Sequence, residues 1–243
     1  MDIQPDTQII VPFLKWAGGK RWLTKYREAL FDTEYERYIE PFLGSGAVFF
    51  DLCPERAILS DANGDLIETY HAIRDDWQRV YAYLQDYQQR HSKDHYYATR
   101  EKTLRNPFTR AARFIYLNRT CWNGLYRVNK DGKFNVPIGT KSTVLLDSDN
   151  FSAIAEQLNK AEISTTDFEV TIEKCRQGDL LFVDPPYTVK HNHNGFIKYN
   201  ETLFSWDDQV RLHHSLVEAK WTYPEKTDTL RYPCSASNWI GVR

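Results

Sequence analysis

Short apolar runs, each ended by polar or turn-forming residues, recur along the chain and predict buried strands. Leu180–Val183 is rich in bulky and branched side chains, and Pro185 and Pro186 end the run because proline has no N–H to donate. Ala57–Asp61 is a second short apolar run, and Tyr38–Phe50 has the form of a strand, a glycine turn and an apolar helix. Continuously apolar strands are typical of parallel sheets, so the pattern predicts an α/β fold.

Helical spacing of the apolar positions dominates the middle of the chain. It covers Asp65–Gln89 and returns in two shorter stretches, His95–Leu104 and Phe108–Asn118. Alternating segments follow in Trp122–Pro137, on either side of Asp131-Gly132, which is a typical hairpin turn. The pattern therefore predicts a small helical insert that ends in a hairpin.

The C-terminal part of the chain departs from the alternation of strands and helices. Asp207–Ala219 has the spacing of an amphipathic helix, but Lys220–Arg243 contains no apolar run except a weak strand candidate at Asn238–Val242. The pattern therefore predicts no clear strand after Asp207–Ala219.

Composition and charge narrow the class of protein. With 243 residues, 42% of them hydrophobic, the chain can form one large domain or one domain with an insert. There is no secretory signal pattern and no apolar run of membrane-spanning length, so we expect a soluble, cytoplasmic protein. Residues 88–143 hold 12 Lys and Arg against 3 Asp and Glu, within a chain of net charge −2. This basic block fits a solvated helical surface or a surface for phosphates, and its interleaved aromatic residues favour the second.

Asp184-Pro185-Pro186-Tyr187 carries the most informative chemistry. At the carboxyl end of a buried strand it presents a carboxylate, backbone carbonyls and an aromatic ring. The Asp184 carboxylate and the Pro185 carbonyl can each accept an N–H of adenine N6, which turns the nitrogen lone pair outward, while Tyr187 stacks on the base. A methyl group in line with that lone pair can then be transferred by direct displacement. The same residues also fit a plain strand-ending turn.

Two stretches nearer the N-terminus suit a nucleoside cofactor. Glu40-Pro41-Phe42-Leu43-Gly44-Ser45-Gly46 is a glycine turn before a helix, and Asp61 follows at about twenty residues, a spacing at which an acid can hold ribose hydroxyls. The third glycine of the dinucleotide fingerprint is missing, which argues against a nicotinamide or flavin cofactor. In the earlier turn, Trp16 can pack on a ligand and Lys20 can meet a carboxylate. That turn also fits a loop in which Trp16 anchors the core.

Two further signals are open to more than one interpretation. Asp167-Phe168 fits either a contact with a cofactor adenine or the start of a short helix that runs through Ile172. His191 and His193 have the spacing of metal ligands, but no carboxylate accompanies them, so we expect no metal.

The predicted hairpin suits the major groove of DNA. Its arms carry Arg127, Asn129, Lys130, Lys133 and Asn135. In that groove Arg reads guanine, and Asn or Gln reads adenine. The alternative is an exposed edge hairpin that its charges keep soluble.

Five motifs in this order resemble those of the DNA adenine methylases (Dam family), a D12 class of N6-adenine DNA methyltransferases. They are Lys15-Trp16-Ala17-Gly18-Gly19-Lys20, Glu40-Pro41-Phe42-Leu43-Gly44-Ser45-Gly46, Ser60-Asp61-Ala62-Asn63, Asn123-Gly124-Leu125-Tyr126-Arg127 with Phe134-Asn135-Val136-Pro137, and Asp184-Pro185-Pro186-Tyr187. The resemblance covers roughly residues 10 to 220. It implies a Rossmann-like methyltransferase sheet with an inserted target-recognition domain that bears a β-hairpin. It also implies transfer of a methyl group from S-adenosylmethionine to adenine N6 in duplex DNA at GATC, with the target base flipped out of the helix.

The resemblance assigns expected roles and boundaries. Residues 1–64 and 148–243 would form the catalytic domain and 65–147 the DNA-recognition insert, in a protein expected to be a monomer with neither metal nor membrane partner. After the amphipathic helix the family continues with a strand, a helix and two final strands, which are missing or replaced in Lys220–Arg243, so we expect Leu180–Val183 to lie at an unprotected apolar edge of the sheet. This predicts reduced stability, which a cooperative unfolding transition at high temperature would contradict. Asp61 would hold the ribose, and Asp184 would lie near both cofactor and target amine. The expected cofactor residues are Trp16, Lys20, Glu40, Phe42, Gly44, Gly46, Asp61, Asp167, Phe168 and Asp184. The expected catalytic residues are Asp184, Pro185 and Tyr187, and the expected DNA contacts are Lys15, Leu125 and Arg127, supported by Asn123 and Pro137.

Two other functions remain open at this point. A chain that cannot complete its catalytic sheet would be a catalytically silent DNA-binding relic, which binds DNA without the cofactor. A methyltransferase for another amine, such as cytosine N4 or a protein amide, is the second. Asp184 and the long basic insert favour adenine in DNA.

Overall fold

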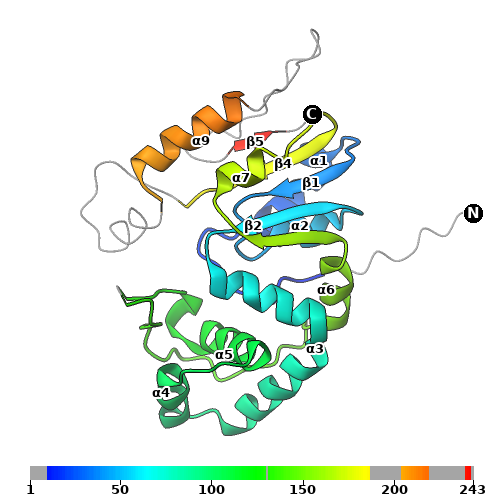
Figure 1. The fold of residues 1–243 in the computed structure, drawn as a ribbon. Coiled ribbons are helices and arrows are strands. Elements are labelled where there is room, and N and C mark those ends of the chain that lie inside the picture. Colours follow the sequence, from blue (N-terminus) through cyan, green and yellow to red (C-terminus); the bar gives the residue numbers. More distant parts are fainter. Residues whose placement is uncertain (1–9, 130, 187–203, 219–238, 242–243) are drawn as a thin grey trace, which may run out of the picture. The chain divides into compact units, whose positions relative to one another are not determined.

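The computed structural model describes residues 10–129, 131–186, 204–218 and 239–241 (Figure 1). The chain divides into two compact units. We call the first, Met1–Thr24, Gly44–Cys53 and Asn63–Lys160, the helical unit. The second, Lys25–Leu43, Pro54–Ala62 and Ala161–Arg243, is the sheet unit.

The sheet unit contains a five-stranded sheet of order β3-β2-β1-β4-β5. Its strands are β1 (Arg37–Glu40), β2 (Ala57–Asp61), β3 (Ala161–Thr165), β4 (Asp179–Val183) and β5 (Trp239–Gly241). The first four are mutually parallel, and β5 pairs antiparallel with β4. This arrangement confirms the α/β fold of Rossmann-like methyltransferase type, with β1, β2 and β4 in the predicted stretches.

The expectation of an unprotected edge at Leu180–Val183 is wrong for the part of the chain that the structure describes. Trp239–Gly241, inside the weak strand candidate, pairs with β4 in the register Leu181↔Gly241 and Val183↔Trp239. The N–H and C=O groups on that side of β4 therefore have a neighbouring strand. The sequence pattern held only a weak signal for this strand, because three residues are too few to show an apolar period, and it did not predict the pairing with β4.

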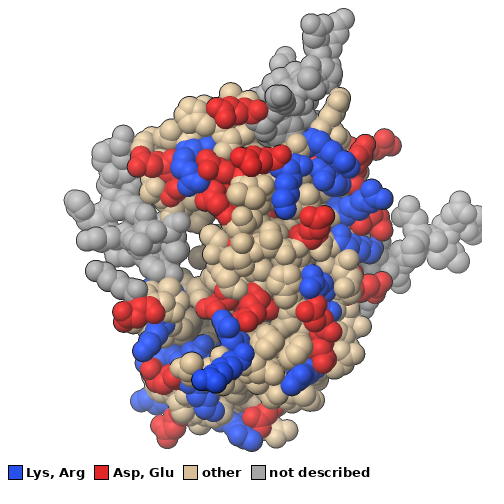
Figure 2. All heavy atoms as spheres, in the orientation of Figure 1, with Lys and Arg blue, Asp and Glu red and all other residues tan. Residues whose placement is uncertain are grey.

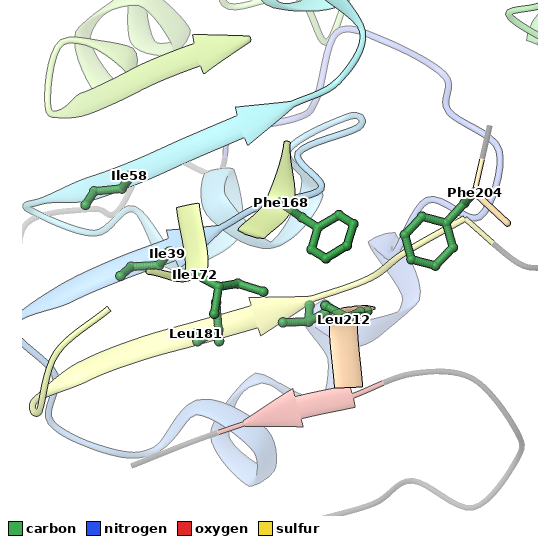
Figure 3. Close-up of a cluster of buried hydrophobic side chains, with 8 residues drawn as sticks. Ile39, Ile58, Phe168, Ile172, Leu181, Phe204 and Leu212 are labelled. Atoms are coloured by element: carbon green, nitrogen blue, oxygen red, sulfur yellow. The ribbon is translucent and has the colours of Figure 1, made fainter. Parts of the chain in front are cut away.

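One face of the sheet is covered by α7 (Phe168–Ile172) and α9 (Trp206–Glu218). Figure 3 shows the buried cluster between the sheet and these two helices. Its members are Ile39, Ile58, Phe168, Ile172, Leu181, Val183, Phe204 and Leu212. The other face receives α1 (Arg27–Phe31), where the Phe31 ring meets the Phe182 ring edge-on, with centroids 6.3 Å apart. Alternate residues of β4 thus pack on opposite faces, as strand geometry requires.

The helical unit is built around α3 (Gly64–Arg90), which packs against α5 (Pro107–Thr120) and α6 (Phe151–Leu158). It also contains α2 (Ala47–Leu52), α4 (Lys93–Glu101) and the 3₁₀ turn η2 (Trp122–Gly124), while the 3₁₀ segment η1 (Arg21–Tyr26) leads into α1. Side-chain caps start the longer helices: Asn63, Ser92, Asn106 and Asn150 each accept a backbone N–H of the first turn. The predicted helices at 65–89, 95–104 and 108–118 are confirmed with shifted ends.

A buried ion pair fixes α5 within the helical unit. The Arg119 guanidinium bonds both carboxylate oxygens of Asp149 at 2.6 Å and also donates to the carbonyls of Phe13 and Val144. Because every donor direction is used, the cost of burying the two charges is offset. The N-terminal segment, α5 and the segment before α6 are thereby held together.

No helix among the described residues is both long and apolar enough to cross a membrane. The division into a catalytic domain at 1–64 and 148–243 and an insert at 65–147 stays a prediction.

Candidate functional site

Three predicted site carboxylates lie at the carboxyl ends of neighbouring parallel strands of the sheet unit. Glu40 ends β1, Asp61 ends β2, and Asp184 directly follows β4. In parallel sheets this edge is where ligands bind. The structure therefore places these three predicted residues at one edge of the sheet.

Glu40 is the most deeply buried of the three, with 3% of its surface exposed. The hydroxyl of Tyr38, two residues earlier on the same face of β1, donates to Glu40 Oε2 at 2.9 Å. Burial raises the pKa of the Glu40 carboxyl well above its usual range, and the charges of Asp184 and Asp61 raise it further, whereas the Tyr38 bond acts in the opposite direction. The group is an acid that loses its proton more easily when positive charge is near.

The predicted catalytic segment follows the buried strand β4 as expected. Asp184 and Pro185 are half-buried, whereas every residue of Asp179–Val183 is buried. Burial thus decreases at Asp184 as a whole residue, but its Oδ1 atom is itself buried at the end of the strand. Tyr187 lies outside the described residues, as do His191 and His193.

Phe42 and Phe168, both predicted cofactor residues, are in contact. Their rings are stacked with centroids 5.4 Å apart, and Phe204 packs against both. Asp167 caps α7 through the N–H of Glu169 and pairs with Arg211 of α9 at 2.9 Å. Phe168 is 5% exposed, so most of its ring serves the core. The helix-start interpretation of Asp167-Phe168 is confirmed, and a contact with the cofactor stays a prediction.

The glycine turn lies in the helical unit. Gly44 and Gly46 have φ of 49° and 62°, a backbone conformation that glycine adopts without strain, and Gly46 precedes α2. The hydroxyl of Tyr70, in α3, donates to the Gly44 carbonyl at 2.9 Å. A Cβ at Gly44 would come within 2.8 Å of Trp16 Cδ1, so the indole lies directly against the turn. Two separate predicted cofactor stretches thus meet here.

Lys20 is buried, with 3% of its surface exposed, and its Nζ donates to the Gly18 carbonyl at 2.7 Å. Gly18 has φ of 78°, and the Gly19 N–H bonds the Trp16 carbonyl at 3.1 Å. The two glycines therefore close a tight turn that bears Trp16 at one end and Lys20 at the other.

The predicted DNA contacts are brought together by Asn118, a buried residue of α5 that sequence reasoning missed. Asn118 Oδ1 accepts the N–H of Lys15 at 2.9 Å, and Nδ2 donates to the carbonyls of Lys15 at 2.8 Å and Gly124 at 3.3 Å. The Lys15 side chain lies against Gly124, where a Cβ would be 2.6 Å from Lys15 Cδ. Neighbouring Asn123 has φ of 55°. A polar residue within an apolar helical stretch was the one available signal for Asn118.

The hairpin is formed, with an antiparallel bridge between Val128 and Phe134 and another between Cys121 and Ile138 at its base. Asn135 Oδ1 accepts the Arg127 Nε–H at 2.9 Å, which orients the guanidinium. The Asn129 carboxamide oxygen accepts two backbone N–H groups of the tip, from Asp131 at 3.0 Å and Lys133 at 2.9 Å. At the base of the hairpin, the Trp122 N–H donates to the Pro137 carbonyl at 2.9 Å, so the supporting residues Asn123 and Pro137 lie close together.

Only some of the basic side chains of residues 88–143 are available at the surface. Arg113 donates to the carbonyls of Thr99 and Arg100 at the end of α4, and Arg110 pairs with Asp65 and Glu68. Arg113 and the buried Arg119 thus serve internal contacts, whereas Arg110 is paired with acids at the surface. On the face that Figure 2 shows, positive side chains lie among negative ones. The surplus of basic residues in the sequence therefore overstated the charge available to phosphates.

Comparison with known proteins decides the family. The family described as D12 class N6 adenine-specific DNA methyltransferase matches residues 16–238. The chain belongs to this family. A type II methyltransferase of Lactococcus lactis subsp. cremoris is 37% identical over 210 residues, which span 83% of this chain and 74% of the relative. A type II methyltransferase of Methanocaldococcus jannaschii is 36% identical over 225 residues (84% and 78%), and a DNA adenine methylase of Haemophilus influenzae is 36% identical over 209 residues (83% and 72%).

Membership in the family makes this chain an N6-adenine DNA methyltransferase that uses S-adenosylmethionine as methyl donor. Each unit by itself carries groups whose chemistry suits that cofactor. The helical unit has a glycine turn backed by an indole, and the sheet unit has carboxylates at neighbouring strand ends that favour a positively charged group. Among the described residues, no cluster of three or more His, Cys, Asp or Glu side chains is arranged to hold a metal ion.

Proposed function

We propose that this methyltransferase modifies N6 of adenine in duplex DNA at GATC, with the base readers and cofactor residues predicted from the sequence. The main support is the Asn118 linkage, which joins Lys15 to the start of the hairpin that carries Leu125 and Arg127. Relatives named DNA adenine methylase at 31–36% identity add to it.

In the proposed reaction, Asp184 accepts one N–H of the target amine and the Pro185 carbonyl accepts the other. These two bonds orient the nitrogen lone pair, and Tyr187 stacks on the flipped base. The bound cofactor supplies a methyl group on a positively charged sulfur. The N–CH₃ bond would form as the S–CH₃ bond breaks, and the methylated nitrogen would then lose one of its N–H protons to solvent. Catalysis rests on positioning and on the negative charge of Asp184, which stabilises the positive charge that develops on the nitrogen.

The cofactor residues divide by chemistry. Asp61 is assigned to the ribose hydroxyls, and Glu40 and Asp184 to the positively charged end of the cofactor. Trp16 and the turn at Gly44 and Gly46 provide an apolar surface and backbone groups, and Lys20 is assigned to a carboxylate. Phe42, Asp167 and Phe168 are assigned to the adenine.

For DNA, Arg127 is assigned to a guanine. Asn135 accepts the N–H of Arg127 Nε and so orients the guanidinium, and the two terminal nitrogens are the groups assigned to the base. Lys15 and Leu125 are assigned to the other base contacts, with Asn123 and Pro137 in support. One chain carries all of these residues, so a monomer suffices. A DNA substrate also agrees with the predicted cytoplasmic location.

The test is methyl transfer from labelled S-adenosylmethionine to two unmethylated duplexes that differ only in a GATC or a scrambled site. Transfer confined to GATC is expected, and a GATC duplex already methylated on both strands is the control that should accept no label. Equal transfer to both duplexes would contradict the proposed specificity. Duplex binding without cofactor binding or transfer would favour the DNA-binding relic instead.

A further inference from the structure

Tyr126 is a residue of the hairpin that the roles assigned above do not use. It is half-buried and lies in the chain between Leu125 and Arg127, two proposed base readers. Its ring stacks on the indole of Trp16, with centroids 5.6 Å apart and 21° between the ring planes. A hairpin residue therefore supports the side chain that is proposed to pack on the cofactor.

The contact belongs to a group of three rings. Phe114 of α5 lies 4.9 Å from Tyr126 and 6.4 Å from Trp16, measured between centroids. Trp16 also lies against the glycine turn, where it leaves no room for a Cβ at Gly44. Because packed rings have few alternative arrangements, a shift of Tyr126 changes the support of the indole.

Tyr126 is itself held from two directions. Its ring lies 5.8 Å from that of Phe134, on the opposite arm of the hairpin. Its hydroxyl donates to Asp65 Oδ2 at 3.2 Å, and Asp65 also pairs with Arg110 at 3.0 Å. The position of Tyr126 thus depends on how the hairpin lies against α3 and α5.

We propose that Tyr126 is a positioning residue that couples the binding of DNA to the binding of S-adenosylmethionine. The inference rests on the function proposed above for Trp16, Leu125 and Arg127. When bases hold Leu125 and Arg127, the residue between them is held as well, and its ring fixes the indole of Trp16. By linkage, the cofactor raises the affinity for DNA by the same factor. A contact of the strength usual for aromatic pairs predicts a factor on the order of 2- to 10-fold.

The experiment measures this factor in the full chain and in Tyr126→Leu. Calorimetry gives the Kd of S-adenosylhomocysteine, the product of methyl transfer, with and without saturating GATC duplex, so that no turnover occurs. The Kd of the duplex is measured with and without the same ligand. The wild type should show a coupling of about 2- to 10-fold in both directions, and Tyr126→Leu should reduce it to about 1.

Two matched variants separate coupling from general loosening. Tyr126→Phe keeps the ring and loses only the hydroxyl bond to Asp65, so it should keep the coupling. Tyr97→Leu removes a half-buried ring of α4 that packs against Tyr96 and under Arg100, without touching Trp16, so it should also keep the coupling. If thermal unfolding shows that Tyr126→Leu does not fold, Tyr126→Met takes its place, because methionine fills a similar volume without a ring.

Three results would overturn the inference: a wild type without coupling, full coupling in Tyr126→Leu, or loss of coupling in Tyr97→Leu. Failure of the proposed GATC specificity would look different. In that case the wild type binds GATC and scrambled duplexes equally, while the coupling factor is still measurable on either duplex.

Discussion

In the helical unit, Lys15, Asn118 and Gly124 are joined by hydrogen bonds in which each buried polar group meets a partner of opposite character. In the sheet unit, Glu40, Asp61 and Asp184 bring three acidic groups to neighbouring strand ends, and the pKa of Glu40 is raised because burial and the other two charges both disfavour its ionised form. The first group is stable as it stands. In the second, the environment of Glu40 disfavours a further negative charge, which a positively charged ligand would offset.

The two groups therefore contribute differently. The hydrogen-bonded group is already held in place before any ligand binds, and the acidic group favours the binding of a positively charged ligand. Hydrogen-bonded residues define a fixed surface, and their loss lowers the stability of the folded chain. Clustered acids lower the stability of the chain without ligand and increase its affinity for a cationic one. Substitutions in the two groups should therefore affect stability and activity in different proportions.

The largest effect is expected for Asp184→Ala. It removes the proposed acceptor of an N6 hydrogen and should lower the rate of methyl transfer by about 10²- to 10³-fold or more, the usual size of a lost transition-state contact. Single-turnover transfer to a GATC duplex measures this effect. The Kd for the duplex should stay near that of the wild type. Retained turnover would remove Asp184 from the catalytic role.

Asn118→Ala should instead affect stability and specificity together. It leaves the N–H and C=O of Lys15 without their buried partner and should lower the free energy of unfolding by about 2–3 kcal/mol. Urea unfolding and the GATC-to-scrambled ratio of transfer are the measurements. The control is Asn106→Ala, which removes the cap of α5 at a cost of about 1 kcal/mol and should leave the ratio unchanged.

Arg127→Ala should reduce discrimination at one base position by about 1–3 kcal/mol. Transfer rates on a set of duplexes with single substitutions in GATC measure this change. A uniform loss across all sequences would assign Arg127 to a phosphate instead. Asn135→Ala, which removes only the bond that orients Arg127 Nε, should give a smaller change at the same position.

Glu40→Gln should change the pH dependence of stability. Because the folded chain raises the pKa of Glu40, its contribution is complete below the ordinary glutamate pKa and is lost as the pH rises through the folded value. The free energy of unfolding of the wild type should therefore fall across this window, by at most about 1.4 kcal/mol per pH unit from this group. Urea unfolding at several pH values should show a shallower fall in Glu40→Gln. An unchanged slope would contradict the assignment.

The strands at 37–40, 57–61 and 179–183 could be predicted because each is a buried run of apolar residues with a polar end. The strand Ala161–Thr165 could not, because it lies at the edge of the sheet, and its burial alternates irregularly. The helix Phe151–Leu158 was missed although Phe151, Ile154, Ala155 and Leu158 have helical spacing, which was a readable signal. The pairing of Trp239–Gly241 depends on a distant strand and has no local signature.

The candidate site shows the same division. Motifs predicted Trp16, Gly44, Asp61, Arg127 and Asp184 as site residues, because the residues that form a turn or a strand end are consecutive in the sequence. Their supporting residues were not identifiable in this way. Asn118 and Tyr38 lie outside the five motifs, and Tyr126 lies inside one without an assigned role; the contacts of all three appear only in the structure.

The sequence by itself determined which functional groups stand at each strand end and turn, and with them the family and its chemistry. The tertiary structure decided which residues hold those groups in place. Asn118 lies 103 residues from Lys15 in the chain, and Arg211 lies 44 from Asp167. Such contacts depend on how the whole chain closes its loops around the core, and a local pattern of polar and apolar residues does not contain that information.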